Sequence, residues 1–320
     1  MNANNAAQYS AGRKREQDEA RKWIVRLIFV IYLLLIFEGT LRKWLLPSFQ
    51  SVLFFIRDPL VVVAFFLATK AGLWPVKSLL FQAGLALAVA FAILGLFQIG
   101  FLGVHPYAVL YGMRMYFMYL PLAFLIGRVF SGKNLKTLQD ITMVIAIPMA
   151  FLAFRQFHSE ADSFINLSYE AIPANVTVVN HPRPSGTFTF HDGHALFVMT
   201  AVMFVLNSWT LVGKRRWTDW LLLILSTIAA VVELTVVVNR KAFFVVAAFI
   251  PTLLISAAGA QSRGAVVKRA VLAGVVGAGA IALMFTSSSM IFQEESKAVV
   301  DRTAEAGSNE GSHETRLVWY

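Results

Sequence analysis

The sequence predicts an all-α, polytopic transmembrane bundle of about nine helices with two outward-facing polar segments. Two observations lead to this fold class. Of the 320 residues, 58% are hydrophobic and only 14% are charged. The apolar residues also gather in several runs of about 18 residues or more, the length at which a helix crosses a bilayer. These runs are too continuous for barrel strands, and lipid offers the backbone no hydrogen-bond partners, so the runs must form helices.

The apolar runs divide the chain into three parts. Residues 1–22 form a polar tail that we expect to be disordered or amphipathic, 23–285 form the transmembrane domain, and 286–320 form a polar segment. Inside the domain, a longer polar loop at 155–190 separates the fifth and sixth helices. The predicted helices are about 23–41, 52–69, 78–101, 107–130, 138–154, 191–211, 219–238, 242–258 and 267–285.

The distribution of Lys and Arg orients the bundle. The short loops on the side of the N-terminal tail carry more Lys and Arg than the short loops on the opposite side, which predicts a cytoplasmic N-terminus and outward-facing polar segments. The same distribution explains the net charge of +10 without nucleic acid, because no contiguous basic face results. The absence of cysteine excludes disulfides, thiol nucleophiles and cysteine metal sites.

One polar stretch, HPRPSGTFTFHDGHALF at 181–197, lies where the outward loop enters the sixth helix. It places Arg183 between two prolines and Gly186 in a turn-prone pair, and then places His191, Asp192 and His194 at the start of the helix. The three last residues are the candidate catalytic groups. They are also suited to capping a helix N-terminus, and with no third ligand at convincing spacing we predict no metal site.

Further charged residues fall at the outward ends of the predicted helices, where ionisable groups are functional candidates by default. An alternative is purely structural: Glu38 would pair with Arg42 at i,i+4, and Arg57 would pair with a nearby carboxylate. The candidate site-supporting residues are Glu38, Arg57, Asp58, Gly186 and Glu233, and the candidate ligands for a phosphate are Arg183, Arg240, Lys241 and Arg316. Guanidinium groups suit that role because they stay charged and bind phosphate through two parallel hydrogen bonds.

Five short segments, at 38–47, 55–59, 183–188, 234–243 and 312–320, together resemble the O-antigen ligase and O-antigen polymerase superfamily of bacterial membrane proteins. RPSGTF (183–188) is similar to the Arg-x-x-Gly-Thr-Phe segment that opens a helix in that superfamily, and LTVVVNRKAF (234–243) to its Leu-Thr-x-Ser-Arg-Gly segment. EGTLRKWLLP (38–47) with FIRDP (55–59) resembles the N-terminal signature of one branch, and SHETRLVWY (312–320) an outward loop. The chain departs from the family at Asn239, Lys241 and His191, and we expect it to be truncated after Tyr320, before the usual catalytic histidine.

The resemblance implies glycosyl transfer on the outer face of the bacterial inner membrane. The donor would be a glycan on undecaprenyl pyrophosphate, and the acceptor a second lipid-linked glycan, a lipid A core or a protein hydroxyl. Arginines would hold the diphosphate, a His or carboxylate would act as general base, and no cofactor would be needed. The partners would be the bilayer, the lipid-linked glycan and envelope polysaccharide assembly proteins. The alternatives are a lipid-linked glycan transporter (a flippase) and a non-catalytic subunit of an assembly complex.

Overall fold

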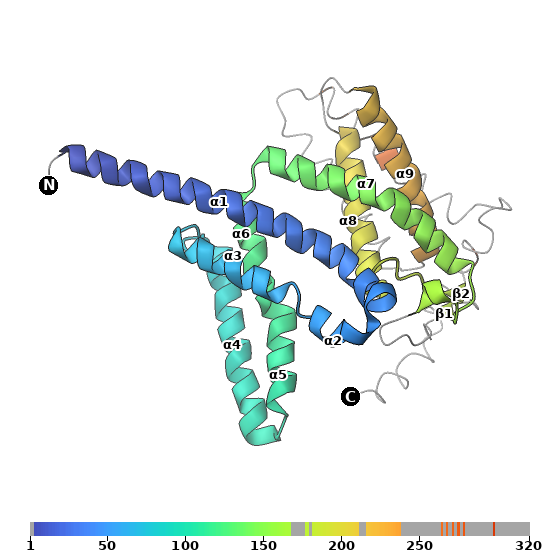
Figure 1. Cartoon of the computed structure of the whole chain (residues 1–320), viewed down its shortest axis with the longest axis horizontal. Helices are drawn as coiled ribbons and strands as arrows, with labels where there is room; N and C mark the ends of the chain where they lie inside the picture. Colours follow the sequence, from blue (N-terminus) through green and yellow to red (C-terminus); the bar gives the residue numbers. More distant parts are fainter. Residues whose placement is uncertain are drawn as a thin grey trace. The chain divides into compact units, whose positions relative to one another are not determined.

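The computed structural model describes residues 3–167, 177–178, 181–210 and 216–237, together with single positions at 264, 267, 271, 274, 275, 278 and 297. Within this part of the chain the structure is helical, apart from one pair of two-residue strands (Figure 1). The chain forms two compact units. Unit 1 comprises Met1–Leu35 and Ser51–Thr137, and unit 2 comprises Ile36–Gln50 and Leu138–Tyr320.

Six helical stretches of the described residues are long and apolar enough to cross a membrane, which makes the chain a multi-pass helical membrane protein. They are Gly12–Leu45, Pro47–Lys70, Leu79–Leu102, Pro106–Val129, Gly132–Phe157 and Trp217–Val237. The predicted sixth helix is also present, as α8 (His191–Thr210). The continuously described ranges do not include the predicted helices at 242–258 and 267–285 or the polar segment at 286–320. The predicted count of nine helices therefore also falls outside them.

The structure corrects one of the two alternatives expected for the N-terminal tail, namely that it is disordered. The tail is not a disordered segment, because α1 runs without interruption from Ala3 to Thr40 and joins the tail to the first apolar run. Ala, Gln, Glu, Lys and Arg dominate the tail, and these residues have high helix propensity. The side chains of Gln17 and Arg21 also bind the carbonyls of Ala71 and Arg128, at 3.0 Å each, so the polar end of α1 packs on the rest of unit 1.

Two predicted helices of unit 1 are interrupted at prolines, which lack the amide hydrogen that a helix interior needs. The run predicted at 52–69 forms α2 (Gln50–Leu53) and α3 (Asp58–Lys70), with Pro59 in the first turn of α3. The run predicted at 107–130 forms α5 (Pro106–Met113), a π-helical turn η3 (Arg114–Met118) and α6 (Leu120–Val129), with Pro121 at the start of α6. Between these pairs lies α4 (Leu79–Leu102).

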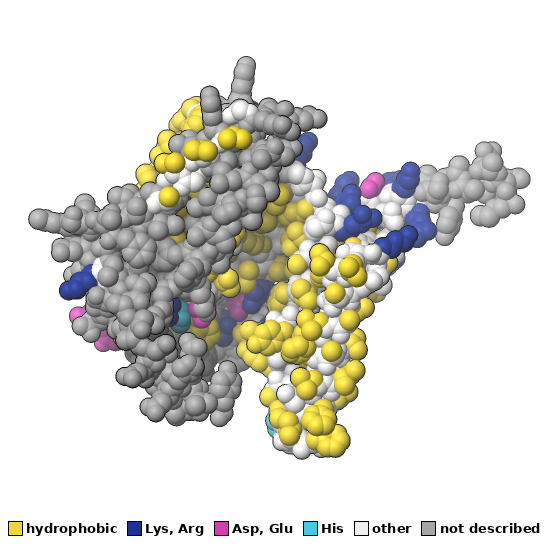
Figure 2. Space-filling view, turned by 180° about the vertical axis from the view of Figure 1, so that it is seen from behind, with side chains coloured by type: hydrophobic (Ala, Val, Ile, Leu, Met, Phe, Trp, Pro, Cys, Tyr) yellow, Lys and Arg dark blue, Asp and Glu magenta, His cyan; other side chains and the backbone are white. Residues whose placement is uncertain are grey.

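The core of unit 1 lies between α1, α3 and α6. Ile24, Ile28 and Ile31 follow the helical repeat along one face of α1 and are almost fully buried against residues of the other two helices, among them Val61 and Leu125. The α4–α5 hairpin instead exposes apolar side chains over most of its surface, as Figure 2 shows for the hydrophobic atoms of this part of the molecule. That surface composition is typical of helices that face lipid hydrocarbon.

Unit 2 is built around α7 (Gly132–Phe157), α8 and α9 (Trp217–Val237). The last two helices pack against each other along their lengths, and the six residues between them make the pair antiparallel. Shorter elements complete the unit: the π-helical turn η1 (Leu41–Leu45), two 3-10 turns at Pro47–Phe49 and Phe164–Asn166, and the antiparallel strands β1 (Thr177–Val178) and β2 (His181–Pro182).

Candidate functional site

The site is formed where the end of α1 packs on the turn that precedes α8, called here the 185–189 turn. Gly39 in the last turn of α1 makes this contact possible. A Cβ at Gly39 would overlap the carbonyl oxygen of Thr187 and would lie 2.5 Å from the carbonyl carbon of Phe188 and 2.6 Å from the amide nitrogen of Thr189. All three atoms belong to the backbone, so a glycine is required at this position.

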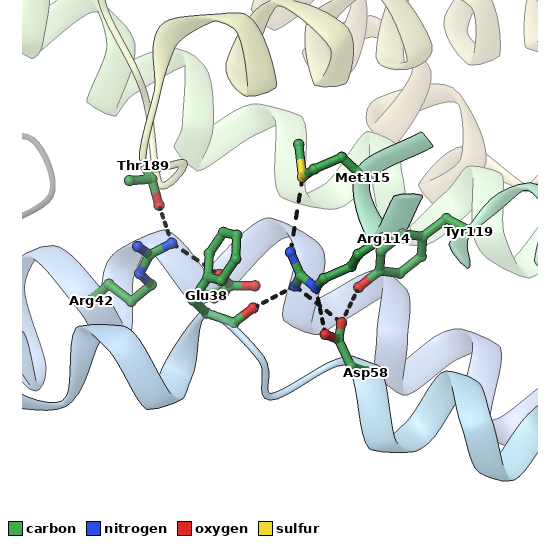
Figure 3. Close-up of polar contacts among 8 residues, drawn as sticks. Glu38, Arg42, Asp58, Arg114, Met115, Tyr119 and Thr189 are labelled. Atoms are coloured by element: carbon green, nitrogen blue, oxygen red, sulfur yellow. Dashed lines mark hydrogen bonds and ion pairs between the residues drawn. The ribbon is translucent and has the colours of Figure 1, made fainter. Parts of the chain in front are cut away.

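Side-chain hydrogen bonds secure the same contact from both partners. The hydroxyl of Thr187 donates to the carbonyl of Ile36 at 2.6 Å. The Nη1 group of Arg42 donates to Thr189 Oγ1 at 3.4 Å and to Glu38 Oε1 at 3.2 Å (Figure 3). The predicted i,i+4 pair of Glu38 and Arg42 is thus confirmed, and the pair is part of the packing between the two segments.

Lys43 is one of the residues at this contact that the sequence did not single out. The side chain is 1% exposed, and its ammonium donates to Ser185 Oγ at 3.0 Å and to the carbonyl oxygen of Gly186 at 2.9 Å. Its position in η1 directs it inward together with Arg42, although the run LRKWL resembles a basic membrane boundary in the sequence. The sequence signal that could have identified Lys43 is that two basic residues, Arg42 and Lys43, follow Glu38 and Gly39 within five positions.

Replacing Lys43 with methionine is expected to lower the free energy of unfolding by about 1–3 kcal/mol, because the buried Gly186 carbonyl and Ser185 hydroxyl lose a charged donor. Methionine keeps an unbranched apolar side chain of similar length, so the change in stability reports the loss of the ammonium group. The loss is measured as a lower melting temperature of the detergent-solubilised chain. Arg155→Met, at an exposed arginine of α7, is the control, and equal melting temperatures for the two variants would contradict the role of Lys43.

Gly186 has the left-handed backbone conformation, with φ of 55°, which other L-residues adopt at a cost. The Phe188 amide donates to the Ser185 carbonyl at 2.9 Å and closes the turn. Gln156, which is fully buried at the end of α7, binds both backbone groups of Gly186: its Oε1 accepts from the amide at 2.7 Å and its Nε2 donates to the carbonyl at 3.3 Å. The turn is therefore held by α7 as well as by α1.

The three predicted catalytic residues occupy different environments. His194 is fully buried beneath the turn, where a Cβ on Gly186 would lie 2.6 Å from its Nδ1 atom. Neither ring nitrogen of His194 has a hydrogen-bond partner among the described residues. His191 and Asp192 lie near the surface, with side chains 23% and 64% exposed and with 3.7 Å between His191 Nε2 and Asp192 Oδ1. Of the two histidines, His191 is the one that a substrate can reach.

Arg183 directly precedes the 185–189 turn. Pro182 and Pro184 on either side of it are buried, while Arg183 itself is half-buried. Together with Arg42 it makes two guanidinium groups on these two short segments, against the single carboxylate of Glu38. The electrostatic balance of this part of unit 2 is therefore positive, and it favours an anionic ligand.

Glu233 lies in α9 and is fully buried, with neither carboxylate oxygen hydrogen-bonded within the described ranges. Because α8 and α9 are antiparallel, Glu233 near the end of α9 and His194 near the start of α8 lie at the same end of the helix pair. Buried polar groups of this kind require a partner, commonly ordered water. The predicted ligands Arg240, Lys241 and Arg316 lie outside the described residues.

Arg57 and Asp58 belong to a separate polar cluster in unit 1. Asp58 is bound through both oxygens by Arg114, with Nε to Oδ2 at 2.6 Å and Nη2 to Oδ1 at 3.1 Å, and it also accepts from the Tyr119 hydroxyl at 2.8 Å (Figure 3). The Arg57 guanidinium lies over the Tyr119 ring at 5.5 Å. Sequence reasoning missed Arg114 as a partner, because nothing in the sequence marks the π-helical turn that presents it.

No group of three or more His, Asp or Glu side chains that could hold a metal ion occurs in the part of the chain that the structure describes. The arrangement of unit 2 can instead bind an anion beside Arg183 and offer an accessible imidazole at His191. No protein-family model, no curated protein and no solved structure matches the chain. The resemblance of its segments to the O-antigen superfamily therefore rests on those segments alone.

Proposed function

We propose that the chain is a glycosyltransferase of the O-antigen polymerase or ligase type, acting on the outer face of a bacterial inner membrane with its N-terminus in the cytoplasm. One observation carries the proposal. Residues 38–43 and 183–189, which resemble two separate motifs of that superfamily, pack on each other through Gly39 and Lys43. Two motifs that lie far apart in the sequence thus contribute to one positively charged site.

The diphosphate of an undecaprenyl-pyrophosphate donor suits this site. Arg42 and Lys43 donate to Thr189, Ser185 and Gly186 beside the proposed diphosphate position. Arg183, half-buried between two buried prolines, is the direct ligand in this scheme, and Arg240, Lys241 and Arg316 are the proposed further ligands. Cations so placed stabilise the charge that develops on the leaving diphosphate.

An apolar groove in unit 2 suits the lipid tail of the donor. It lies between α7 and α9, has a volume of about 320 Å³, and is lined only by apolar side chains, among them Ala150, Phe154, Ile228 and Val232. Phe154 lies two residues before Gln156, which holds the 185–189 turn. The groove therefore extends from the end of α7 at which the diphosphate would bind, as an amphiphile with a polar head and a polyprenyl tail requires.

The proposed reaction is a displacement at the anomeric carbon of the donor glycan. The acceptor hydroxyl oxygen forms the new glycosidic bond, the bond from the anomeric carbon to the diphosphate oxygen breaks, and undecaprenyl pyrophosphate leaves. The hydroxyl proton passes to a general base. The exposure of His191, with Asp192 beside it, makes this imidazole the better candidate, while the buried His194 supports the turn from below.

Replacing Arg183 with alanine tests the assignment. We expect long-chain surface polysaccharide to fall about tenfold or more, the effect of losing one charge-assisted hydrogen-bonding group worth about 1.5–3 kcal/mol, while the amount of inserted protein stays constant. Arg183→Lys should recover only part of the activity because lysine cannot bind phosphate through two parallel bonds. Arg155→Ala, at an exposed arginine of the same unit, is the control. Polysaccharide at the wild-type level in Arg183→Ala would refute the role of Arg183.

A strain that lacks the whole chain distinguishes the acceptor classes. Loss of long chains with one capped repeat unit left indicates a polymerase, whereas long chains retained on the lipid carrier indicate a ligase. Loss of the glycan from a protein alone indicates a protein oligosaccharyltransferase. A lipid-linked glycan trapped on the inner leaflet would contradict the proposal and indicate a flippase. Unchanged glycosyl transfer by membranes purified from this strain would indicate a non-catalytic subunit.

A further inference from the structure

The polar end of α1 carries a dense set of cations that the proposed reaction does not use. Residues 13–22 of α1 contribute five of them, and the ends of α3 and α6 and the turn after α3 contribute three more. Together they form the basic rim of unit 1: Arg13, Lys14, Arg15, Arg21, Lys22, Lys70, Lys77 and Arg128. All eight side chains are exposed, and Figure 2 shows Lys and Arg atoms gathered on this arm of the molecule.

Specific contacts hold these cations in one place. Gln17 donates to the carbonyl of Ala71 at 3.0 Å and Arg21 to the carbonyl of Arg128 at 3.0 Å. Lys70 and Glu16 form an ion pair at 3.5 Å. The polar end of α1 is thus fixed on the ends of α3 and α6, and the charges of three chain segments form one surface within unit 1. The expectation that the cations form no contiguous basic face therefore does not hold for this unit.

The rim keeps a positive excess after its internal pairing. The carboxylates on the same stretch of α1 are Glu16, Asp18 and Glu19, of which Glu16 pairs with Lys70 and Glu19 with Arg15 at 3.6 Å. Both pairs are largely exposed, so each neutralises its cation only weakly. Eight cations against three carboxylates leave a strong positive potential.

The position of the rim along α1 identifies the layer in which it lies. The apolar face of α1 begins at Ile24, directly after Trp23, which is 56% exposed. The guanidinium of Arg26 lies over the Trp23 ring at 4.9 Å. Tryptophan is enriched at the membrane–water interface, and Arg21 and Lys22 directly precede Trp23, so this end of the rim is expected at the depth of the lipid headgroups.

We propose that the basic rim binds the phosphate groups of anionic phospholipids in the leaflet that surrounds it. A headgroup reaches the rim with its acyl chains alongside the apolar part of α1, whereas a soluble polyanion would gain only the charge interaction. Anionic lipid attracts juxtamembrane Lys and Arg within a Debye length. The bound lipids hold the polar end of α1 at the membrane surface, and this role is independent of the proposed glycosyl transfer.

The experiment uses the full chain in nanodiscs of either phosphatidylcholine or an equal mixture of phosphatidylcholine and phosphatidylglycerol. We expect the anionic lipid to raise the melting temperature of the wild type by several degrees and to remain bound in native mass spectra. Arg13→Gln/Lys14→Gln/Arg15→Gln should lose most of that rise. Glu16→Gln/Asp18→Asn/Glu19→Gln, which adds to the positive excess, should show a larger rise, and 0.5 M salt should reduce the rise in each protein.

Two results would overturn the proposal. An equal rise in the wild type and in the Arg13–Lys14–Arg15 variant would place the lipid effect elsewhere on the chain. Stabilisation by soluble polyphosphate as large as that by phosphatidylglycerol would assign the rim to a soluble polyanion. Arg155→Gln, at an exposed arginine of unit 2, is the control for the loss of a cation, and it should retain the full rise.

Discussion

Gly39→Ala is expected to lower the free energy of unfolding by about 3 kcal/mol or more, the upper part of the range for overpacking a closely packed contact. The added methyl group would overlap the Thr187 carbonyl oxygen and crowd the backbone of Phe188 and Thr189. Backbone atoms cannot rotate out of the way, so α1 must separate from the 185–189 turn. The hydrogen bonds from Lys43 and Thr187 would then be lost as well.

Gly12→Ala is the matched control, because Gly12 lies in the same helix and a Cβ there would meet nothing within 4 Å. Alanine has the higher helix propensity, so this variant should be neutral or more stable by up to about 1 kcal/mol. Unfolding temperatures of the two variants in detergent are compared with the wild type. A Gly39→Ala protein that melts with the wild type would show that the end of α1 does not pack on the turn as described.

Asp58→Ala is expected to destabilise the chain by about 3 kcal/mol, because it leaves the largely buried guanidinium of Arg114 without its carboxylate partner. Asp58 and Arg114 are 16% and 12% exposed and are joined by two hydrogen bonds. Tyr119 loses its acceptor in the same variant. Asp162→Ala, at an exposed aspartate of unit 2, should change the stability by no more than about 0.5 kcal/mol.

The double variant Asp58→Ala/Arg114→Met isolates the pair interaction. Since methionine removes the charge that Asp58→Ala leaves unpaired, the double variant should be more stable than the sum of the two single effects predicts, by at least about 1 kcal/mol. Additive effects of the two substitutions on the unfolding free energy would mean that the pair contributes no coupling to the stability of unit 1.

The structure brings together two of the residues that the sequence singled out for the candidate site. Glu38 and Gly186 were chosen from their positions, and the structure brings both into the contact between α1 and the 185–189 turn. Gln156 and Lys43 could not be chosen in this way. A glutamine at a helix end and a lysine in a basic run are ordinary surface residues in sequence, and only the approach of the 185–189 turn makes them buried hydrogen-bonding groups.

By itself, the sequence determined that the chain is a multi-pass helical membrane protein and where most of its apolar helices lie, because the hydrophobic length needed to cross a bilayer is a local property. It did not determine that the polar end of α1 packs on the rest of unit 1, which depends on Gln17 and Arg21 reaching the carbonyls of Ala71 and Arg128. Nor did it determine that residues 38–43 meet residues 185–189. Those segments are about 145 positions apart, and their meeting depends on Gly39 having no side chain and on buried hydrogen bonds that form only in the folded chain.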